Sequence, residues 1–132
     1  MPASYYVQTN SLNMWLAKSP SVTLPSTVYV GLFLTNPTGA GSGTEVTGNG
    51  YSRMAATFGN PTQSGSTMVI SNTNRIEFPQ ATGTWGTPQY FALYDSSSGG
   101  NLLFYDSLPT TFEIVSGMAP VFATGNLTVS CQ

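Results

Sequence analysis

The chain has 132 residues, of which 40% are hydrophobic and only 6% are charged, and it contains no histidine. The charged fraction lies far below the ~25% of an average soluble domain, which predicts a polar but neutral surface. The three basic residues, Lys18, Arg53 and Arg75, are too few to bind a nucleic-acid backbone or an anionic membrane, so both are excluded as partners.

Residues 1–20 are predicted to form an N-terminal helical arm, which is the only helix expected in the chain. Four apolar side chains fall close to one face of such a helix: Tyr5, Leu12, Trp15 and Leu16. Lys18 is expected in the last turn, and Pro20 is expected to end the helix. An arm with an aromatic face either covers one end of a β body or docks on a neighbouring subunit, and both roles stay open.

Residues 21–132 are predicted to form a β body built from short strands. The expected strands span 27–34, 51–58, 66–71, 74–78, 89–95, 101–108, 111–116, 119–124 and 126–131. Turn residues separate them roughly every 8–12 residues, and no helical pattern lies between them. The predicted fold class is therefore all-β: a single-domain antiparallel β-sandwich, similar to a jelly roll, with a short N-terminal helix. Residues 1–132 are expected to form this one domain.

The segment 35–50 is rich in glycine and is longer than most connections between strands. It contains no nucleophile or base. We expect it to form a surface loop that contacts a neighbouring molecule.

A β-hairpin is predicted over residues 89–108, around the turn "SSSGG". Strict alternation places one apolar set on one face: Phe91, Leu93, Leu103 and Tyr105. It places a second apolar set on the other face: Tyr90, Ala92, Tyr94, Leu102 and Phe104. Both faces are therefore expected to be covered, one by the opposite sheet and the other by the helix, the long loop or another chain.

No catalytic, cofactor or metal site is predicted. The absence of histidine excludes Ser–His–Asp and Cys–His catalysis and the usual zinc sites, and Cys131 has no second thiol. Asp95 and Asp106 flank the hairpin and could approach as closely as the carboxyl pair of a glycosidase. However, an Asp beside a Ser/Gly turn usually accepts backbone N–H groups. The segment 95–101 is similar to a calcium loop but lacks the further acidic ligands.

In so neutral a chain, each charge is expected to have a structural partner. We expect Arg53 and Arg75 to fasten strands together by pairing with carboxylates, the candidates being Glu77, Asp95 and Asp106. An alternative role for the two arginines is recognition of a carbohydrate or carboxylate ligand.

Low charge also favours contact with other molecules, because neutral polar groups cost less to desolvate and repel one another little. A homo-oligomer is therefore expected. Six aromatic residues are the candidate contacts with other subunits or larger assemblies: Tyr5, Tyr6, Trp15, Trp85, Tyr90 and Tyr94. Trp85 is expected to be either a buried packing residue or a subunit anchor.

Four motifs, "YVGL", "GYSR", "FPQATGTWG" and "GGNLLF", occur in this order between residues 29 and 104. In order and spacing they resemble a family of small bacteriophage virion proteins that are commonly labelled tail fibre proteins. The resemblance implies a structural part of the virion with no enzymatic activity and no cofactor. Because the first residues lack a signal-peptide pattern, assembly is expected in the cytoplasm of the host bacterium.

Two placements in the particle stay open. The first is a capsid decoration or cement protein that binds the major capsid protein as an oligomer, with a trimer expected, and stabilises the shell. The second is a tail fibre, collar or baseplate protein that contacts other tail proteins and serves host attachment. The small size and the lack of a fibrous shaft favour the capsid. A third reading, outside any virion, is a β-sandwich carbohydrate-binding module or a small hydrolase.

Overall fold

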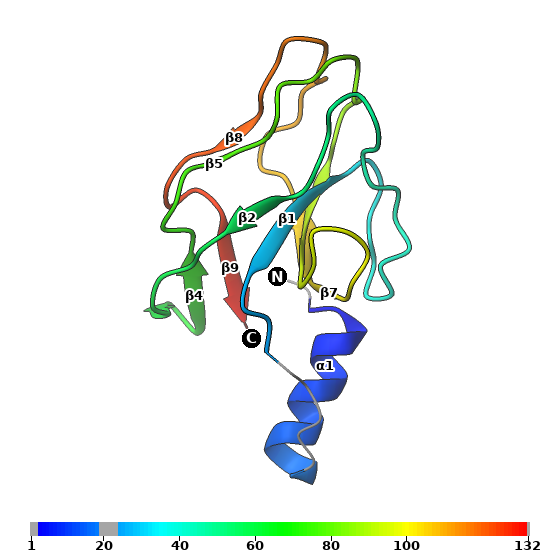
Figure 1. The fold of residues 1–132 in the computed structure, drawn as a ribbon. Helices are drawn as coiled ribbons and strands as arrows, with labels where there is room; N and C mark the ends of the chain where they lie inside the picture. Colours follow the sequence, from blue (N-terminus) through cyan, green and yellow to red (C-terminus); the bar gives the residue numbers. More distant parts are fainter. Residues whose placement is uncertain (1–2, 19–23, 132) are drawn as a thin grey trace.

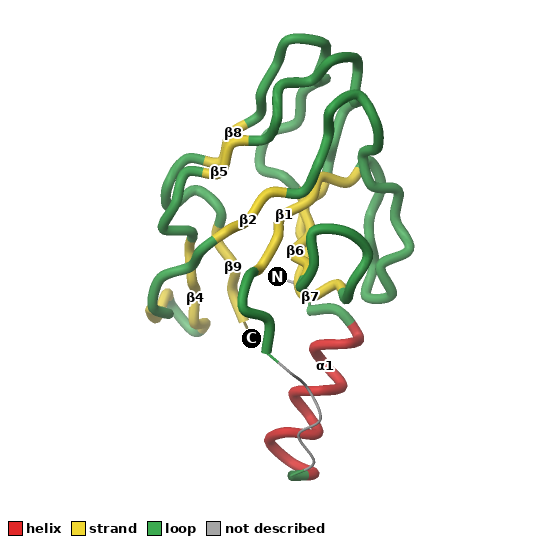
Figure 2. The backbone as a smooth tube through the Cα atoms, in the orientation of Figure 1, coloured by secondary structure: helices red, strands yellow, loops and turns green. Residues whose placement is uncertain are grey.

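The computed structural model describes residues 3–18 and 24–131, which form a β body with one projecting helix (Figure 1). The arm comprises α1 (Tyr5–Leu12) and a π-helical segment, η1 (Asn13–Ala17). The strands are β1 (Val28–Phe33), β2 (Met54–Ala56), β3 (Thr62–Ser64), β4 (Thr67–Ser71), β5 (Ile76–Glu77), β6 (Tyr90–Tyr94), β7 (Leu102–Ser107), β8 (Val121–Phe122) and β9 (Thr128–Cys131). Loops form most of the end of the body that lies opposite α1 (Figure 2).

The strands form three sheets, and all their pairings are antiparallel. The largest has the order β2-β1-β6-β7, the second has the order β3-β4-β9, and β5 and β8 form the third. β1 lies inside the largest sheet, which explains why its sequence is apolar on both faces. The predicted all-β sandwich with antiparallel sheets and a short N-terminal helix is confirmed.

One face of the four-stranded sheet forms the main core together with the two smaller sheets. The residues that this sheet contributes include Val30 and Leu32 from β1, and Phe91 and Leu93 from β6. The opposite side contributes residues from β5, β9 and the segments beside them, including Ile76, Phe78, Leu127 and Val129. Burying each large side chain of this kind stabilises the fold by about 1.5–3 kcal/mol.

The other face of the four-stranded sheet holds a smaller buried cluster of Phe33, Ala92, Tyr94 and Leu102. The loop 35–50 folds back over this face: a Cβ atom at Gly41 would lie 3.7 Å from Leu102 Cδ2 and 3.8 Å from the Tyr94 hydroxyl. The last part of the loop also pairs with the end of β1 and the residue after it. Leu34 N donates to Thr44 O at 2.8 Å, and Val46 N donates to Leu32 O at 3.0 Å. The long loop of the same chain therefore lies on the face whose cover was left open by the sequence.

A β-bulge changes the predicted faces of the hairpin. The register of β6 and β7 shifts between Leu93 and Tyr94, so Leu93 faces Phe104, and Ala92 faces Tyr105. As a result Phe104 packs on the main core and Tyr105 packs on the smaller cluster. The sequence-based assignment of these two residues is wrong, because an extra residue in one strand reverses the alternation beyond it.

Two other predicted segments differ from the structure. The turn expected between 58 and 66 contains a short exposed strand, β3, which pairs with β4. The strand expected over 111–116 is reduced to a single bridge between Gly86 and Ile114. The segment 111–116 has only this one bridge and enters a turn at residue 116, so it forms part of a loop beside the core.

The root of the arm is fixed to the edge of the sheet. Ser4 begins α1, and its Oγ accepts a hydrogen bond from Val7 N at 3.2 Å and donates to the carbonyl of Leu102. Its backbone N–H donates to Leu103 O at 2.9 Å. A serine at this position satisfies the free N–H groups of the first helical turn, which explains why the helix begins here.

Beyond its root the arm leaves the β body (Figure 1). No residue of α1 is buried, so the helix does not cover an end of the body, as one of its two predicted roles required. The π-helical segment ends at Lys18, which has a left-handed backbone with φ of 57°. Pro20, and with it the predicted boundary between arm and body at residue 20, lies outside the described residues.

Candidate functional site

A buried ion pair joins the long loop to β2 and to the hairpin turn. Arg53 binds Glu45 through two hydrogen bonds, Nε to Oε2 at 2.8 Å and Nη2 to Oε1 at 2.9 Å. Its Nη1 donates to the carbonyls of Ser96 at 3.0 Å and Gly99 at 2.8 Å. The Tyr51 hydroxyl donates to Glu45 at 2.7 Å. Only 8% of the Arg53 side chain and 21% of the Glu45 side chain are exposed, so this pair is protected from solvent.

β1 leaves space for the cluster because it has a glycine at its centre. A Cβ atom at Gly31 would lie 2.7 Å from Glu45 Oε2 and 2.9 Å from the Tyr51 hydroxyl. Arg53 also contacts an aromatic ring: its Cζ atom lies 3.7 Å from the centroid of the Tyr94 ring. This is a cation–π contact, which adds to the two hydrogen bonds with Glu45.

Burial and neighbouring charges shift the pKa values of three residues of the cluster, Arg53, Tyr51 and Tyr94. Burial disfavours the charged form of Arg53, but the hydrogen bonds and charge of Glu45 outweigh it and keep the pKa of Arg53 above its ordinary value. Burial, followed by the hydrogen bond to Glu45, raises the pKa of the Tyr51 phenol far above its usual range. Burial also raises the pKa of Tyr94, against the effect of Arg53. A general acid or base needs a pKa near the working pH, so this cluster fits a structural role.

Arg75 forms the second ion pair, with Glu77, at 2.9 Å between Nη1 and Oε1. The two side chains are 59% and 52% exposed, so water and salt screen the pair. It joins two residues of the same short segment. It does not fasten one strand to another, as was expected.

The prediction that Asp95 and Asp106 form ion pairs is wrong, since in the described parts of the chain neither lies within 4.0 Å of a lysine or arginine nitrogen. Asp95 Oδ1 accepts from Asn101 N at 2.7 Å, and Asp106 Oδ1 accepts from Ser107 N at 2.8 Å. For Asp95 this is the ordinary role of an aspartate in a turn. Asp106 lies within β7, where its carboxylate accepts from the backbone N–H of the next residue.

The six predicted contact residues fall into three groups by burial. Trp85 and Tyr94 are buried, at 4% and 7% exposure, and serve packing within the chain. The Trp85 indole N–H donates to Asn49 O at 2.9 Å. Tyr6 and Tyr90 are partly buried. Tyr5 and Trp15 are exposed, so these two stay available as contacts with other molecules.

The far end of the arm presents apolar side chains to solvent. Leu12 is 60% exposed, Trp15 79% and Leu16 75%. Leu24, where the described chain resumes, is 75% exposed. Neighbouring apolar residues with this exposure are characteristic of a surface that contacts another protein.

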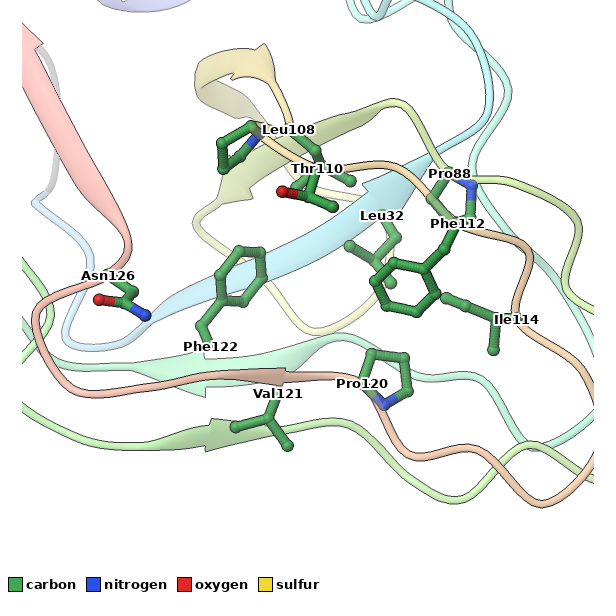
Figure 3. A pocket seen from close by; sticks show the side chains of 11 residues that line it. Leu32, Pro88, Leu108, Thr110, Phe112, Ile114, Pro120, Val121, Phe122 and Asn126 are labelled. Carbon is green, nitrogen blue, oxygen red and sulfur yellow. The ribbon is translucent and has the colours of Figure 1, made fainter.

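A pocket of about 200 Å³ lies between the segment 108–114 and β8. The rings of Phe112 and Phe122 lie on either side of it, with Leu32 of β1 nearby (Figure 3). The two polar side chains in its lining belong to Thr110 and Asn126. The lining has no charged residue, so the pocket fits an apolar group better than a charged substrate.

Within residues 3–18 and 24–131, no group of three or more His, Cys, Asp or Glu side chains could hold a metal ion. No helix in this part of the chain has the length and apolar character needed to cross a membrane.

A comparison with protein-family models shows the family of the chain. The profile of a family described as "Podophage GP4 fiber I protein gp80" matches residues 2–130. The chain belongs to this phage fibre family. The resemblance to phage virion proteins that the four motifs indicated is thereby confirmed. The match to the fibre family extends over α1, β1 to β8 and most of β9, and therefore includes both the arm and the residues that line the pocket. No curated protein matches the chain significantly.

Two functional features of this fibre-family chain were missed at the sequence level. Glu45 was not among the expected partners of Arg53, because it lies in a glycine-rich loop whose path the sequence does not define. The pocket was missed because its lining residues come from β1, β8 and three separate loops. The signal that was available is the group of prolines at 88, 109 and 120, which hold these loops in extended conformations.

Proposed function

We propose that this chain is a non-enzymatic structural subunit of a fibre on a phage particle, and that it acts as a homo-oligomer, with a trimer as the expected form. The observation that carries the proposal is the match of the fibre family to residues 2–130. The projecting arm supports it, because a fibre subunit needs an element that reaches beyond its own body to another molecule. Its location would then be the virion, after assembly in the host cytoplasm.

A non-enzymatic role is supported by the hydrogen bonds that already occupy several of the five carboxylates. Glu45 is bound by Arg53 and Tyr51, Glu77 by Arg75, and Asp95 by a turn. A glycosidase needs two carboxyl groups that face a substrate, one of them able to donate a proton. A hydrolase screen and a glycan array on the purified protein test this part of the proposal. Turnover or binding that disappears on Asp95→Asn or Asp106→Asn would instead support a carbohydrate-binding module or a small hydrolase.

Capsid decoration is the second candidate, favoured by the neutral surface and the 6% charged fraction. The copy number of the protein in purified virions separates the two. If the protein is a fibre subunit, its copy number should be a small multiple of the tail symmetry, and immunogold label should lie on the tail or on discrete appendages. A copy number that scales with the capsomers, and label over the whole head, would favour a decoration protein and contradict the fibre.

A further inference from the structure

We infer that the arm of one copy docks in the apolar pocket of a second copy, with Trp15 in the pocket and Lys18 beside Glu113. The inference rests on the proposed homo-oligomeric fibre and specifies how its subunits join. The contact is heterologous, since each copy gives its arm to one neighbour and receives an arm from another.

The two surfaces match in chemistry. Trp15 is the most exposed of the large hydrophobic side chains in the described residues, at 79%. The pocket has an apolar lining, and Phe112 and Val121 at its rim are 48% and 40% exposed. Trp is a favoured anchor in protein interfaces because it combines a large apolar ring with an N–H donor. Thr110 and Asn126 in the lining are suitable acceptors for the N–H group of an indole.

Among the described residues, one unpaired positive charge lies at the end of the arm, and one unpaired negative charge lies beside the pocket lining. Arg53 and Arg75 are paired within the chain. In the described part of the molecule, Lys18 and Glu113 are exposed and neither has an ion-pair partner within 4.0 Å. Lys18 ends the arm, and Glu113 lies between two pocket residues, Phe112 and Ile114. Asp95 and Asp106 also lack an ion-pair partner within the described ranges, but Glu113 is the one of these three carboxylates that lies beside the pocket lining, so docking the arm in the pocket brings Lys18 of one copy to Glu113 of the next.

The arm cannot fill the pocket of its own chain. It is fixed to Leu102 and Leu103 at the start of β7, whereas Leu108 and Pro109 of the pocket follow the end of the same strand. From its root the arm extends away from the body, while β8 lies on the opposite side of the molecule from α1 (Figure 1). Repeating the contact between copies produces a closed ring or an open chain.

The first test measures the mass of the full chain by sedimentation and light scattering over a range of concentrations. The protein is expected to form an oligomer. Trp15→Ala on the arm and, separately, Phe112→Gln and Thr110→Trp in the pocket should each weaken association about tenfold or more. Thr110 is exposed, so filling the pocket from this position leaves the core intact. Met68→Ala is the matched control: Met68 is 47% exposed on β4, apart from both surfaces, and its loss should not change association.

The second test mixes two defective proteins. Trp15→Ala retains its pocket, and Thr110→Trp retains its arm. The mixture is measured at a concentration where each variant alone is monomeric. If the arm of one copy enters the pocket of another, an equimolar mixture then forms a heterodimer through the one intact arm and the one intact pocket. A symmetric bundle of arms predicts a different result, in which the pocket variants associate normally and the mixture is no better than its parts.

The third test reverses the charges. Lys18→Glu and Glu113→Lys should each weaken association by about two- to fivefold, and the double variant should recover the wild-type dissociation constant. A wild-type protein that stays monomeric, pocket variants that associate normally, or charge reversals without mutual rescue would each overturn the inference. These outcomes concern the purified protein alone. The proposed fibre function is tested separately, by the location and copy number in the virion.

Discussion

The two tryptophans of the chain lie in opposite environments. Trp85 is 4% exposed, contacts the Tyr51 ring edge-on at 5.4 Å between centroids, and donates to Asn49 O. Trp85→Ala should therefore lower the free energy of unfolding by about 3–5 kcal/mol through the cavity that it leaves. Trp15→Ala is the control and should cost less than about 0.5 kcal/mol, since that side chain is exposed. Denaturant titration at low protein concentration measures both. Equal losses would contradict the assigned environments.

The two ion pairs have similar distances but different surroundings, so they provide a second comparison. Arg53→Met should destabilise the fold by about 3–5 kcal/mol, because it leaves Glu45 partly buried without a counter-charge. Arg75→Met should cost less than about 1 kcal/mol, because that pair is exposed. The double variant Arg53→Met, Glu45→Leu should lose less than the sum of its single changes. Chemical denaturation of the wild type, the three single variants Arg53→Met, Arg75→Met and Glu45→Leu, and the double variant measures these effects. A similar small effect at both arginines would refute a structural role for the ion-pair cluster.

The difference between these pairs also shows which contacts the sequence could predict. Arg75 and Glu77 are two residues apart in a short extended segment, so they lie on the same side whatever the fold is. Arg53 and Glu45 meet only because the loop 35–50 folds back on β1. That path depends on tertiary packing around Gly31, which no local pattern encodes.

At the scale of single elements, the arm depends on one buried serine. Ser4→Ala removes the acceptor of the Val7 N–H group and the donor to Leu102 O, and should cost about 1–2 kcal/mol. It should also increase hydrogen exchange in α1, since the arm loses part of its attachment to β7. Ser11→Ala is the matched control, at an exposed position in the same helix. Unchanged exchange in Ser4→Ala would mean that the backbone contacts alone hold the arm.

The hairpin and the segment 111–116 show the limits of periodic patterns. Alternation predicted both strands of the hairpin and their two apolar faces, but it could not locate the bulge that exchanges Phe104 and Tyr105. The apolar residues of 111–116 suited a strand equally well. In the structure Phe112 contributes to the lining of a pocket and is half exposed. A strand sequence without a partner strand remains a loop, and the partner is decided by the whole fold.

At the scale of the whole molecule, composition was the most informative signal. The 40% hydrophobic residues in short runs predicted the β-sandwich, and the 6% charged residues predicted a neutral surface. Composition could not define which strands are neighbours or which apolar residues stay uncovered. The arm has exposed apolar residues at its end and the pocket lies beside β8, and Figure 1 shows that α1 and β8 lie on opposite sides of the body.

The stability of the whole fold should depend on alkaline pH, although the chain has no histidine to titrate near neutrality. In the folded state the pKa of Tyr51 is raised above its ordinary value of 10.0, mainly by burial and then by Glu45. Folding therefore favours the protonated phenol. Its contribution to stability is complete below pH 10 and is lost as the pH rises further, because the unfolded chain then releases a proton that the folded chain retains.

Denaturant titrations between neutral pH and pH 11 should thus show a constant free energy of unfolding, followed by a decline that approaches about 1.4 kcal/mol per pH unit for this one group. Tyr51→Phe should be less stable at neutral pH, because it loses the hydrogen bonds to Glu45 and from Leu32 N, but its alkaline decline should be shallower. Tyr105→Phe is the control, because Tyr105 is a partly buried tyrosine that forms no hydrogen bond with Glu45 or Arg53. This variant should keep the wild-type slope. If Tyr51→Phe declined as steeply as the wild type, the buried phenol would not be the source of the pH dependence.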